Sequence, residues 1–379
     1  MPDPIALLGI RLQVLIGRPD TPLPAPFEVM EALTALSVTN NDREADAFRL
    51  EFSLGRGSSL EYGLLQSGVL DAPNRVIITA IYGGRPQALI DGVITDLQVV
   101  PSNEPGRSTL HVTGEDLSVR LGLEDRNESH PNQSDSPIVT QILARAGFTP
   151  RVTNTSDTPT DRERTPTQQC DDLRYVRRLA QRNGFVFYVG PADVPGAVIA
   201  YWGPENRQGA PQPALRMNMG PYTNVDAPIN FHYNSLGPVE PEITVINPLT
   251  KQPLRIPLPS SPLTALAARP AGALRRTKSR AAANLSLSQA LQQATAGAAE
   301  SSSALEAAGE VDAARYGQAL RARRLVDVCG AGQSYDGTYY VKQVIHDIRR
   351  YPRAEYKMRF TLVREGRGAS GATVTPPAP

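Results

Sequence analysis

Four histidines are the first residues in this sequence that could carry acid–base or metal chemistry. They are His111, His130, His232 and His346. No two of them have the spacing of metal ligands on one helix, as in His-x-x-x-His or His-Glu-x-x-His. His111 and His346 fall inside predicted strands, and nothing in the sequence supplies the geometry that a general base needs. We expect both to be structural, and we predict no metal site.

The adjacent acids Asp171 and Asp172 could be read as paired catalytic carboxylates. Neighbouring residues on a helix point in different directions, and acids are favoured in a first turn, so we predict that they cap a helix. The glycine-rich segment 55–59 is too weak a signal for a phosphate cradle, and no Gly-x-Ser-x-Gly or Walker A motif occurs. We therefore predict no catalytic residue, no cofactor-binding residue and no cofactor, and we expect that the protein is not an enzyme.

Two cysteines, Cys170 and Cys329, are too few and too far apart for a disulfide framework or a zinc site. They indicate a reducing compartment or small core residues. Asn127 and Asn284 each begin a glycosylation acceptor pattern, which we interpret as chance because no export signal is present.

Two further groups of residues could contact a partner. Arg174, Arg177, Arg178 and Arg182 cover part of one predicted helix. We interpret them as a solvated or ion-paired face, with contact to a partner or to DNA as the alternative. Leu285, Leu287, Leu291 and Leu305 lack the tryptophan, phenylalanine and basic face of a membrane-surface helix, so we expect packing or a protein partner.

The composition limits the class of protein. The 379 residues are enough for two to three domains, and 39 basic against 38 acidic residues argue against a dedicated binder of nucleic acid or membrane surfaces. No apolar run approaches the ~20 residues that span a bilayer, and the N-terminus lacks a signal-peptide pattern. Without an export signal, such a protein would act outside the cell only as part of a released particle.

The clearest structural pattern is a hairpin over residues 335–365. Apolar and polar residues alternate there, Asp336-Gly337 supplies a turn at its start, and Tyr351-Pro352 closes it. Residues 91–115 repeat this order: Asp91-Gly92, a strand over 93–100, a loop and a strand over 109–115. Any two β-hairpins look alike, but the same order of turn, strand, loop and strand in both segments predicts two related β-domains.

Further strands are predicted on either side of these hairpins. In the N-terminal region they cover 5–16, 46–54, 75–82 and 87–100, with no convincing helix, which suggests a small antiparallel barrel or sandwich. Strand patterns return at 229–233, 242–247, 254–258 and 325–330. The tail from residue 366 onward lacks core-forming residues, and we expect it to be flexible.

Two segments differ from this β-pattern. Residues 117–132 are polar and irregular. Helices are then predicted from Ser134 to Gly147 and over 170–183, with strands at 185–189 and 198–202, which together describe an α/β insert. Residues 263–323 are rich in alanine, and 284–296 and 311–323 are their best helical pieces.

Five motifs, in this order, carry a resemblance over residues 40–365: Phe48-x-Leu50-x-Phe52-x-Leu54; Ile90-Asp91-Gly92-x-Ile94-Thr95; Ser136-Pro137-Ile138-Val139 through Gly147-Phe148; Asp171-Asp172-Leu173-x-x-Val176-x-x-Leu179-Ala180 with Asn183-Gly184-Phe185-x-Phe187-Tyr188; and Tyr335-Asp336-Gly337-x-Tyr339-Tyr340-Val341-x-x-Val344-x-His346 with Tyr356-x-Met358-x-Phe360. The sequence resembles the baseplate hub proteins of contractile tails, the phage late control D family, and the N-terminal part of type VI secretion spike proteins.

The resemblance implies a mainly β fold with an α/β insert: two pseudo-symmetric, antiparallel, tube-like β-barrels plus a helical insertion. The expected division is 1–118 for the first barrel domain, 119–222 for the insert, 223–262 and 324–366 for the second barrel, 263–323 for the helical insertion, and 367–379 for a flexible tail. Three chains would place six barrels around an axis, matching a sixfold tube above and a threefold spike below.

The resemblance also implies partners and a location. We expect a homotrimer that lines a central channel and contacts a tail tube protein, a separate spike protein and other baseplate components. Spike proteins of this family continue into an oligonucleotide-fold domain and a needle, whereas this chain ends soon after Glu365, so the spike would be another polypeptide. Assembly would occur in the bacterial cytoplasm, within a phage tail baseplate or an extracellular injection particle.

Two other functions remain open at this point. One is a cell-wall hydrolase at the tail tip, which the missing catalytic constellation disfavours. The other is a monomeric β-rich binding module whose alanine-rich section holds a helical partner.

Overall fold

The computed structural model describes residues 9–55, 62–104, 107–159, 165–192, 197–246, 252–257, 263–278, 287–350 and 353–369. Strands dominate these residues, so the prediction of a mainly β protein is confirmed. None of the helices within these ranges is both long and apolar enough to cross a bilayer.

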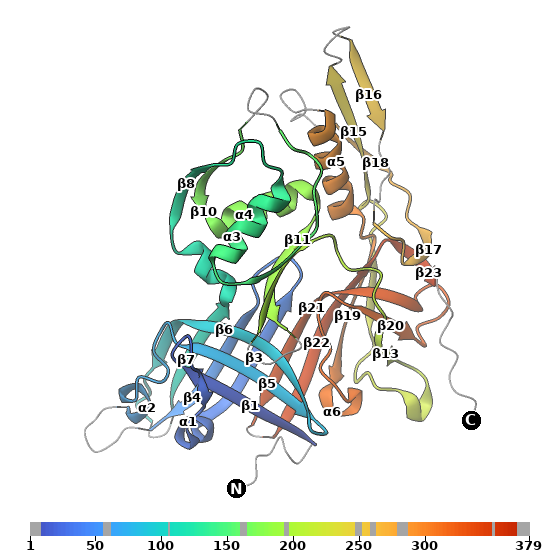
Figure 1. The fold of residues 1–379 in the computed structure, drawn as a ribbon. Coiled ribbons are helices and arrows are strands. Elements are labelled where there is room, and N and C mark those ends of the chain that lie inside the picture. Colours follow the sequence, from blue (N-terminus) through green and yellow to red (C-terminus); the bar gives the residue numbers. More distant parts are fainter. Residues whose placement is uncertain are drawn as a thin grey trace.

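One sheet of 13 strands organises the described part of the chain (Figure 1). Its main path is β14–β19–β22–β21–β3–β4–β7–β6–β5–β1–β2, with β20 beside β21 and β13 beside β20. The strands of its N-terminal half are β1 (Ile10–Gly17), β2 (Leu23–Pro24), β3 (Leu33–Asn41), β4 (Ala47–Leu54), β5 (Arg75–Tyr82), β6 (Arg85–Val100) and β7 (Ser108–Asp116). Those of its C-terminal half are β13 (Gln212–Arg216), β14 (Asn230–Tyr233), β19 (Leu305–Asp312), β20 (Leu325–Cys329), β21 (Gly337–Arg349) and β22 (Glu355–Arg364).

The expected pair of closed barrels is not what these residues form. Strand β21 pairs with β3, so the N-terminal and C-terminal β-regions share one continuous sheet that does not close. The physical reason is that an unpaired strand edge leaves backbone donors and acceptors unsatisfied, and each region covers an edge of the other. Figure 1 shows the blue N-terminal strands running directly into the orange and red C-terminal ones.

Six strands at each end of this sheet follow the same spatial order. The N-terminal half reads β1–β5–β6–β7–β4–β3, and the C-terminal half reads β13–β20–β21–β22–β19–β14. The corresponding strands also occur in the same order along the chain. One pairing differs, because β1 runs antiparallel to β5 whereas β13 runs parallel to β20.

The alternating sequence pattern places the predicted strands well, with two exceptions in the N-terminal half. A short helix, α1 (Phe27–Ala32), was not expected there, and neither was α2 (Gly63–Gln66). Asp91-Gly92 does not form a turn, because it lies inside β6. Asp91 is buried and pairs with Arg75 at 2.6 Å, and a Cβ on Gly92 would lie 2.2 Å from the Glu115 carbonyl oxygen.

The α/β insert packs as its own layer above the sheet (Figure 1). Both predicted helices are present, α3 (Asp135–Arg145) and α4 (Asp172–Asn183), with β9 (Thr149–Val152), β11 (Val186–Pro191) and β12 (Val198–Gly203). The segment expected to be irregular holds η2 (Leu117–Gly122) and β8 (Asp125–Ser129), which pairs with β10 (Thr167–Asp171). A separate core, which includes the fully buried Trp202, holds this insert together.

The alanine-rich segment is helical only in part. Helix α5 (Leu287–Ser301) is present, but 305–312, partly predicted as helix, form strand β19 between β14 and β22. Beyond it only α6 (Ala313–Tyr316) is helical. Tertiary packing overrides local propensity here because Gly309 makes room for the Phe360 ring, whose Cζ would lie 2.7 Å from an added Cβ.

The remaining strands form two small sheets. One contains β15 (Val239–Ile246), β16 (Pro253–Pro257) and β18 (Arg275–Lys278). The other pairs β17 (Ala267–Pro270) with β23 (Gly366–Ala369), so the start of the expected flexible tail is an ordered strand. A short 3-10 helix, η3 (Gly220–Tyr222), completes the elements. Residues 370–379 and the predicted hairpin loop Tyr351-Pro352 lie outside the described residues.

Candidate assembly surface

The junction between β21 and β3 unites the two halves of the sheet. It is antiparallel, and its register runs from Gln343 opposite Asn41 to Arg349 opposite Ala35. Backbone hydrogen bonds extend it at both ends: the Asp42 N–H donates to the Lys342 carbonyl (3.1 Å), and the Arg350 N–H donates to the Thr34 carbonyl (2.9 Å). The outer part of β21 is therefore covered along its length by the neighbouring half.

A buried charge cluster fastens this junction to the α/β insert. The Arg323 guanidinium donates to the Asn41 carbonyl (2.9 Å) and to Asp46 Oδ2 (3.1 Å). The guanidinium carbon Cζ of Arg323 lies 4.1 Å from the centre of the Tyr188 ring in β11. The Arg323 side chain is only 10% exposed, and Asp46 is 2% exposed. One residue therefore joins the segment before β20, the β3–β4 turn and the insert.

Two acids around Arg323 carry raised pKa values. Burial raises the pKa of the Asp116 carboxyl to about 6, and the nearby charge of Asp46 adds to this. Burial likewise raises the pKa of Asp42 to about 6, with a contribution from Glu205. Each of these carboxylates is destabilised in the folded state at neutral pH, because desolvation disfavours the charged form.

A second buried ion network holds the end of β22. The Glu365 carboxylate accepts from the Ala267 N–H (2.6 Å) and from Arg207 Nη1 (3.0 Å). Arg207 also donates to Glu205 at 2.9 Å, and Glu205 in turn accepts from Arg43. These contacts join β17, the segment between β12 and β13, and the β3–β4 turn.

The face of the sheet opposite its core is polar, with charges of both signs. Arg49 pairs with Glu51 at 3.3 Å, Lys357 pairs with Glu310 at 2.9 Å, and Arg359 pairs with Asp347. These side chains alternate along their strands with core residues, as a half-buried sheet requires. Such a face remains hydrated and has no strong net field.

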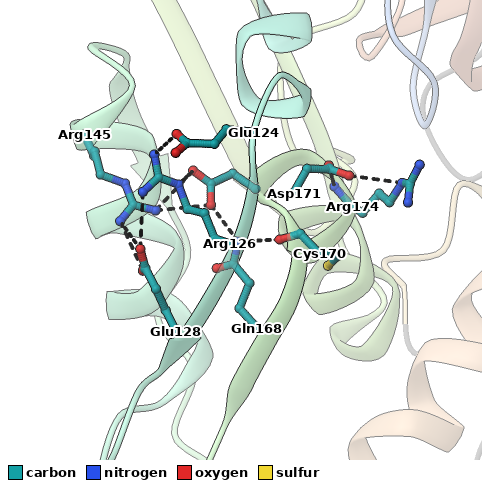
Figure 2. A network of polar contacts seen from close by, with 9 residues as sticks. Glu124, Arg126, Glu128, Arg145, Gln168, Cys170, Asp171 and Arg174 are labelled. Carbon is teal, nitrogen blue, oxygen red and sulfur yellow. Dashed lines mark hydrogen bonds and ion pairs between the residues drawn. The ribbon is translucent and has the colours of Figure 1, made fainter.

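Figure 2 shows a polar network in the insert that explains the paired acids. Asp171 caps α4, since its carboxylate accepts from the Arg174 N–H at 2.8 Å, which confirms the capping prediction for this residue. Asp172 instead accepts from Gln168 (2.7 Å) and from Arg145 (3.1 Å). The two carboxylates are thus separately occupied by structural partners.

The network continues through the charged residues on β8 and α3. Figure 2 shows Arg126 directed toward Glu124, at 2.8 Å, and Arg145 directed toward Glu128, at 3.0 Å. The Arg145 hydrogen bond lowers the pKa of Glu128. These exposed and half-exposed pairs connect β8 to α3 and to the residue just before β8.

The arginines predicted to form a basic face on α4 contact different partners within the chain. Arg174 pairs with Asp171 at 3.1 Å, Arg178 lies 5.0 Å from the Tyr175 ring centre, and Arg182 pairs with Asp135. Three of the four arginines therefore have intramolecular partners, as an ion-paired face predicts. The predicted leucine group does not form one surface, because Leu305 is in the core of β19 and Leu285 lies outside the described residues.

The histidines are not brought together. His346 is buried on β21, its Nδ1 lies 2.9 Å from the Tyr356 hydroxyl, and burial lowers its pKa to about 3. His111 lies on β7 beside Arg49 and Glu51. His130 stacks on the Tyr175 ring in the insert, and His232 is exposed on β14.

No group of three or more histidines, cysteines or acids in the described ranges could hold a metal. Burial raises the pKa of the Cys329 thiol to about 11, so it is a poor nucleophile. The sequence does contain one motif, Gly366-x-Gly368-x-x-Gly371, with the spacing of a dinucleotide-binding loop. Its described part forms β23, an antiparallel strand, rather than the required turn from a strand into a helix.

Sequence reasoning missed Arg323, because this residue was predicted to be the last residue of a helix over 311–323. A signal was present: three arginines, Arg321, Arg323 and Arg324, immediately precede the predicted strand at 325–330. Its partner Asp46, 277 residues away, could not be identified from the sequence alone.

Comparison with solved structures gives the fold. The tail protein from Neisseria meningitidis MC58 superposes with a TM-score of 0.61 at 13% identity, covering 95% of this chain and 98% of that one. The 43 kDa tail protein of prophage MuSo2 from Shewanella oneidensis gives 0.61 at 14% identity, over 94% and 99%. This chain has a tail-hub fold.

The tail-hub fold is shared with secretion proteins. The E. coli c3393 protein, a component of the type VI secretion system, gives a TM-score of 0.54 at 12% identity and covers 91% of this chain and 77% of that one. A chain of the Francisella PdpA–VgrG complex gives 0.58 at 10% identity, over 97% and 59%. By sequence, the chain matches no family description and none of the curated proteins. The expected resemblance is therefore visible in the tertiary structure.

Proposed function

We propose that this protein is a structural hub at the tip of a contractile tail or injection apparatus. It is a homotrimer that adapts a sixfold tube to a threefold spike. The observation that carries this proposal is the strand order repeated at the two ends of the sheet. If each half acts as a tube-like domain, three chains present six similar units, which is what an adaptor between the two symmetries requires.

The polar face of the sheet is proposed to line the central channel. Arg49 and Arg359 are 51% and 53% exposed on it, and each is paired with an acid. A hydrated face of balanced charge lets a polymer pass without holding it, whereas an apolar face would be buried by association.

The proposed partners are those that the fold suggests: a tail tube protein, a separate spike protein and other baseplate components. The protein would be assembled in the bacterial cytoplasm and act in a phage tail baseplate or an extracellular injection particle. The division into domains at 1–118, 119–222, 223–262, 263–323, 324–366 and 367–379 is part of this proposal.

The proposed role is not enzymatic. The paired acids Asp171 and Asp172, the best sequence candidates for catalytic carboxylates, are engaged in structural contacts. A cell-wall hydrolase at the tip is the alternative, and peptidoglycan zymography separates the two. A cleared band from the purified protein would replace the structural role with the hydrolytic one.

The mass of the purified protein tests the proposal. Light scattering or native mass spectrometry should give three times the monomer mass of 40.9 kDa. A monomer would favour the binding-module alternative, and a dimer or tetramer would exclude the threefold adaptor.

A further inference from the structure

Besides the outer edges of β2 and β13, two strand edges of the main sheet lack a sheet partner among the described residues, one on β6 and one on β14. Strand β6 pairs with β7 along residues 92–100, but β5 covers its other side only up to Val93. Strand β14 pairs with β19 on one side and ends the sheet on the other. Neither edge carries a lysine or a proline, the residues that commonly blunt an exposed edge.

The covered junction inside the chain shows what such edges can bind. By the repeated strand order, β6 corresponds to β21 and β14 corresponds to β3. Strand β21 has β20 beside its first part, up to Tyr340, and β3 beside its second part, from Gln343. Strand β6 has the equivalent of β20 but lacks the equivalent of β3.

Two local features fix how β6 and β21 align. Each strand has a register shift against its hairpin partner, between Ile94 and Asp96 in β6 and between Val341 and Gln343 in β21. The backbone N–H of Ile94 donates to the backbone carbonyl of the residue just before β5, at 2.9 Å. In the same way, the backbone N–H of Val341 donates to the backbone carbonyl of the residue just before β20, also at 2.9 Å. Ile94 therefore corresponds to Val341, and Gln98 corresponds to Ile345.

The ladders through the rest of each half align β14 with β3 in the same way. The paired residues can be followed from β7 through β4 to β3 in one half, and from β22 through β19 to β14 in the other. By this alignment His232 of β14 corresponds to Thr39 of β3. Within the chain, Ile345 lies opposite Thr39.

We propose that β6 of one copy pairs, antiparallel, with β14 of the next copy. This rests on the proposed trimer and adds its contact strands and register. Gln98 lies opposite His232 of the neighbouring copy, Val99 opposite Phe231, and Leu97 opposite Tyr233. Each copy presents one edge of each kind, so the contact is head-to-tail and forms a ring if it closes.

The side chains at both edges suit this pairing. Leu97 and Val99 are half-buried against their own core, as are Phe231 and Tyr233. Val100 is 43% exposed at the free end of β6. Pairing would satisfy the outward backbone groups of both strands and extend the apolar layer from one copy into the next.

A cysteine pair tests the register. In a Cys170→Ser background, Gln98→Cys combined with His232→Cys places two exposed thiols opposite each other across the contact. Opposed residues of antiparallel strands have Cα atoms about 4.5–5.5 Å apart, within the span of a disulfide. Mild oxidation followed by a non-reducing gel should give covalent dimers and trimers, and nothing larger.

Three matched samples control the result. Gln98→Cys with Asn230→Cys, two residues out of register, should crosslink roughly tenfold less. Thr39→Cys with Ile345→Cys should form an internal disulfide without a change of mass. A mixture of the Gln98→Cys and His232→Cys single variants should stop at the dimer, because each chain then offers one thiol.

The outcomes separate this contact from the proposed function. A protein of trimeric mass that does not crosslink at Gln98 and His232 overturns the strand pairing and leaves the hub intact. Register-specific crosslinks that continue beyond three chains support the pairing and overturn the threefold hub. A monomer without crosslinks overturns both, and equal crosslinking in and out of register overturns the pairing.

Discussion

Replacing Arg323 with methionine tests how the halves of the sheet and the insert are joined. Methionine keeps an unbranched, flexible side chain, although a shorter one, and removes the charge. Arg323 donates to Asp46 (3.1 Å) and to the Asn41 carbonyl (2.9 Å), and it covers the Tyr188 ring at 4.1 Å. Removing one partner of a buried ion pair costs about 3–5 kcal/mol, because the other charge stays buried and unpaired.

The loss should depend on pH in a defined direction. The folded-state pKa of Asp116 is already raised to about 6 from its ordinary value of 3.8, so its contribution to stability is present below pH 4 and is lost as the pH rises through 6. Without the guanidinium, the carboxylates of Asp46 and Asp116 repel each other more strongly. Arg323→Met should therefore lower the free energy of unfolding more at pH 7.5 than at pH 5.

Urea unfolding followed by two signals measures this. Trp202 is the single tryptophan and is buried in the insert, so its fluorescence reports on the insert, while far-ultraviolet circular dichroism reports on the sheet. Arg324→Met, at the exposed neighbouring arginine, is the matched control and should change stability by less than about 0.5 kcal/mol. Adding Asp46→Asn to Arg323→Met should recover part of the loss, since it removes the unpaired charge.

The reasoning fails if Arg323→Met unfolds within about 1 kcal/mol of the unchanged protein at pH 7.5. It also fails if Arg324→Met is equally damaging, because the effect would then come from general surface charge rather than from the buried cluster.

Three further predictions concern single sites. Asp42→Asn should raise the free energy of unfolding at pH 7 by up to about 3 kcal/mol and leave it nearly unchanged at pH 4. Burial raises the pKa of Asp42 from 3.8 to about 6, so the destabilisation by this carboxyl group grows between these two values and is complete above pH 6. Equal effects of the substitution at both pH values in urea titrations would contradict this. Gly309→Ala should lower the thermal midpoint, since its Cβ would lie 2.7 Å from an aromatic ring of β22, whereas Gly297→Ala on α5 has open space and should be neutral or slightly stabilising; a Gly309→Ala protein as stable as this control would refute the packing argument. Iodoacetamide at pH 8 should label the half-exposed Cys170 and leave the buried Cys329 intact, as peptide mass mapping would show, and labelling of both at similar rates would mean that the sheet opens locally around β20.

The sequence alone determined the elements whose pattern is local. Strict alternation identified β1, β4 and β22, because residues two apart on a strand share a face whatever the strand pairs with. Helix α4 was identified by its acidic first turn and by Gly184, which adopts φ +68° after its last turn. The order of these motifs was also enough to indicate the tail-hub fold.

Tertiary structure decided what local pattern could not. Residues 305–312 have a helical composition, yet they form β19 because the sheet supplies partners on both sides and Gly309 fits beneath Phe360. The same applies to Gly366–Ala369, which becomes a strand only because β17 lies beside it. Local propensity is worth tenths of a kcal/mol per residue, and such contacts outweigh it.

The pairing that joins the two halves of the sheet was the feature least predictable from the sequence. Each hairpin could be predicted from neighbouring residues, but the pairing of β21 with β3 joins residues some 300 positions apart, and Arg323 meets Asp46 across 277. Which edges meet depends on the shape and free backbone groups of the folded halves, and no short-range pattern encodes this. The sequence thus predicted two sets of strands, and the folded chain decided that they join in one open sheet.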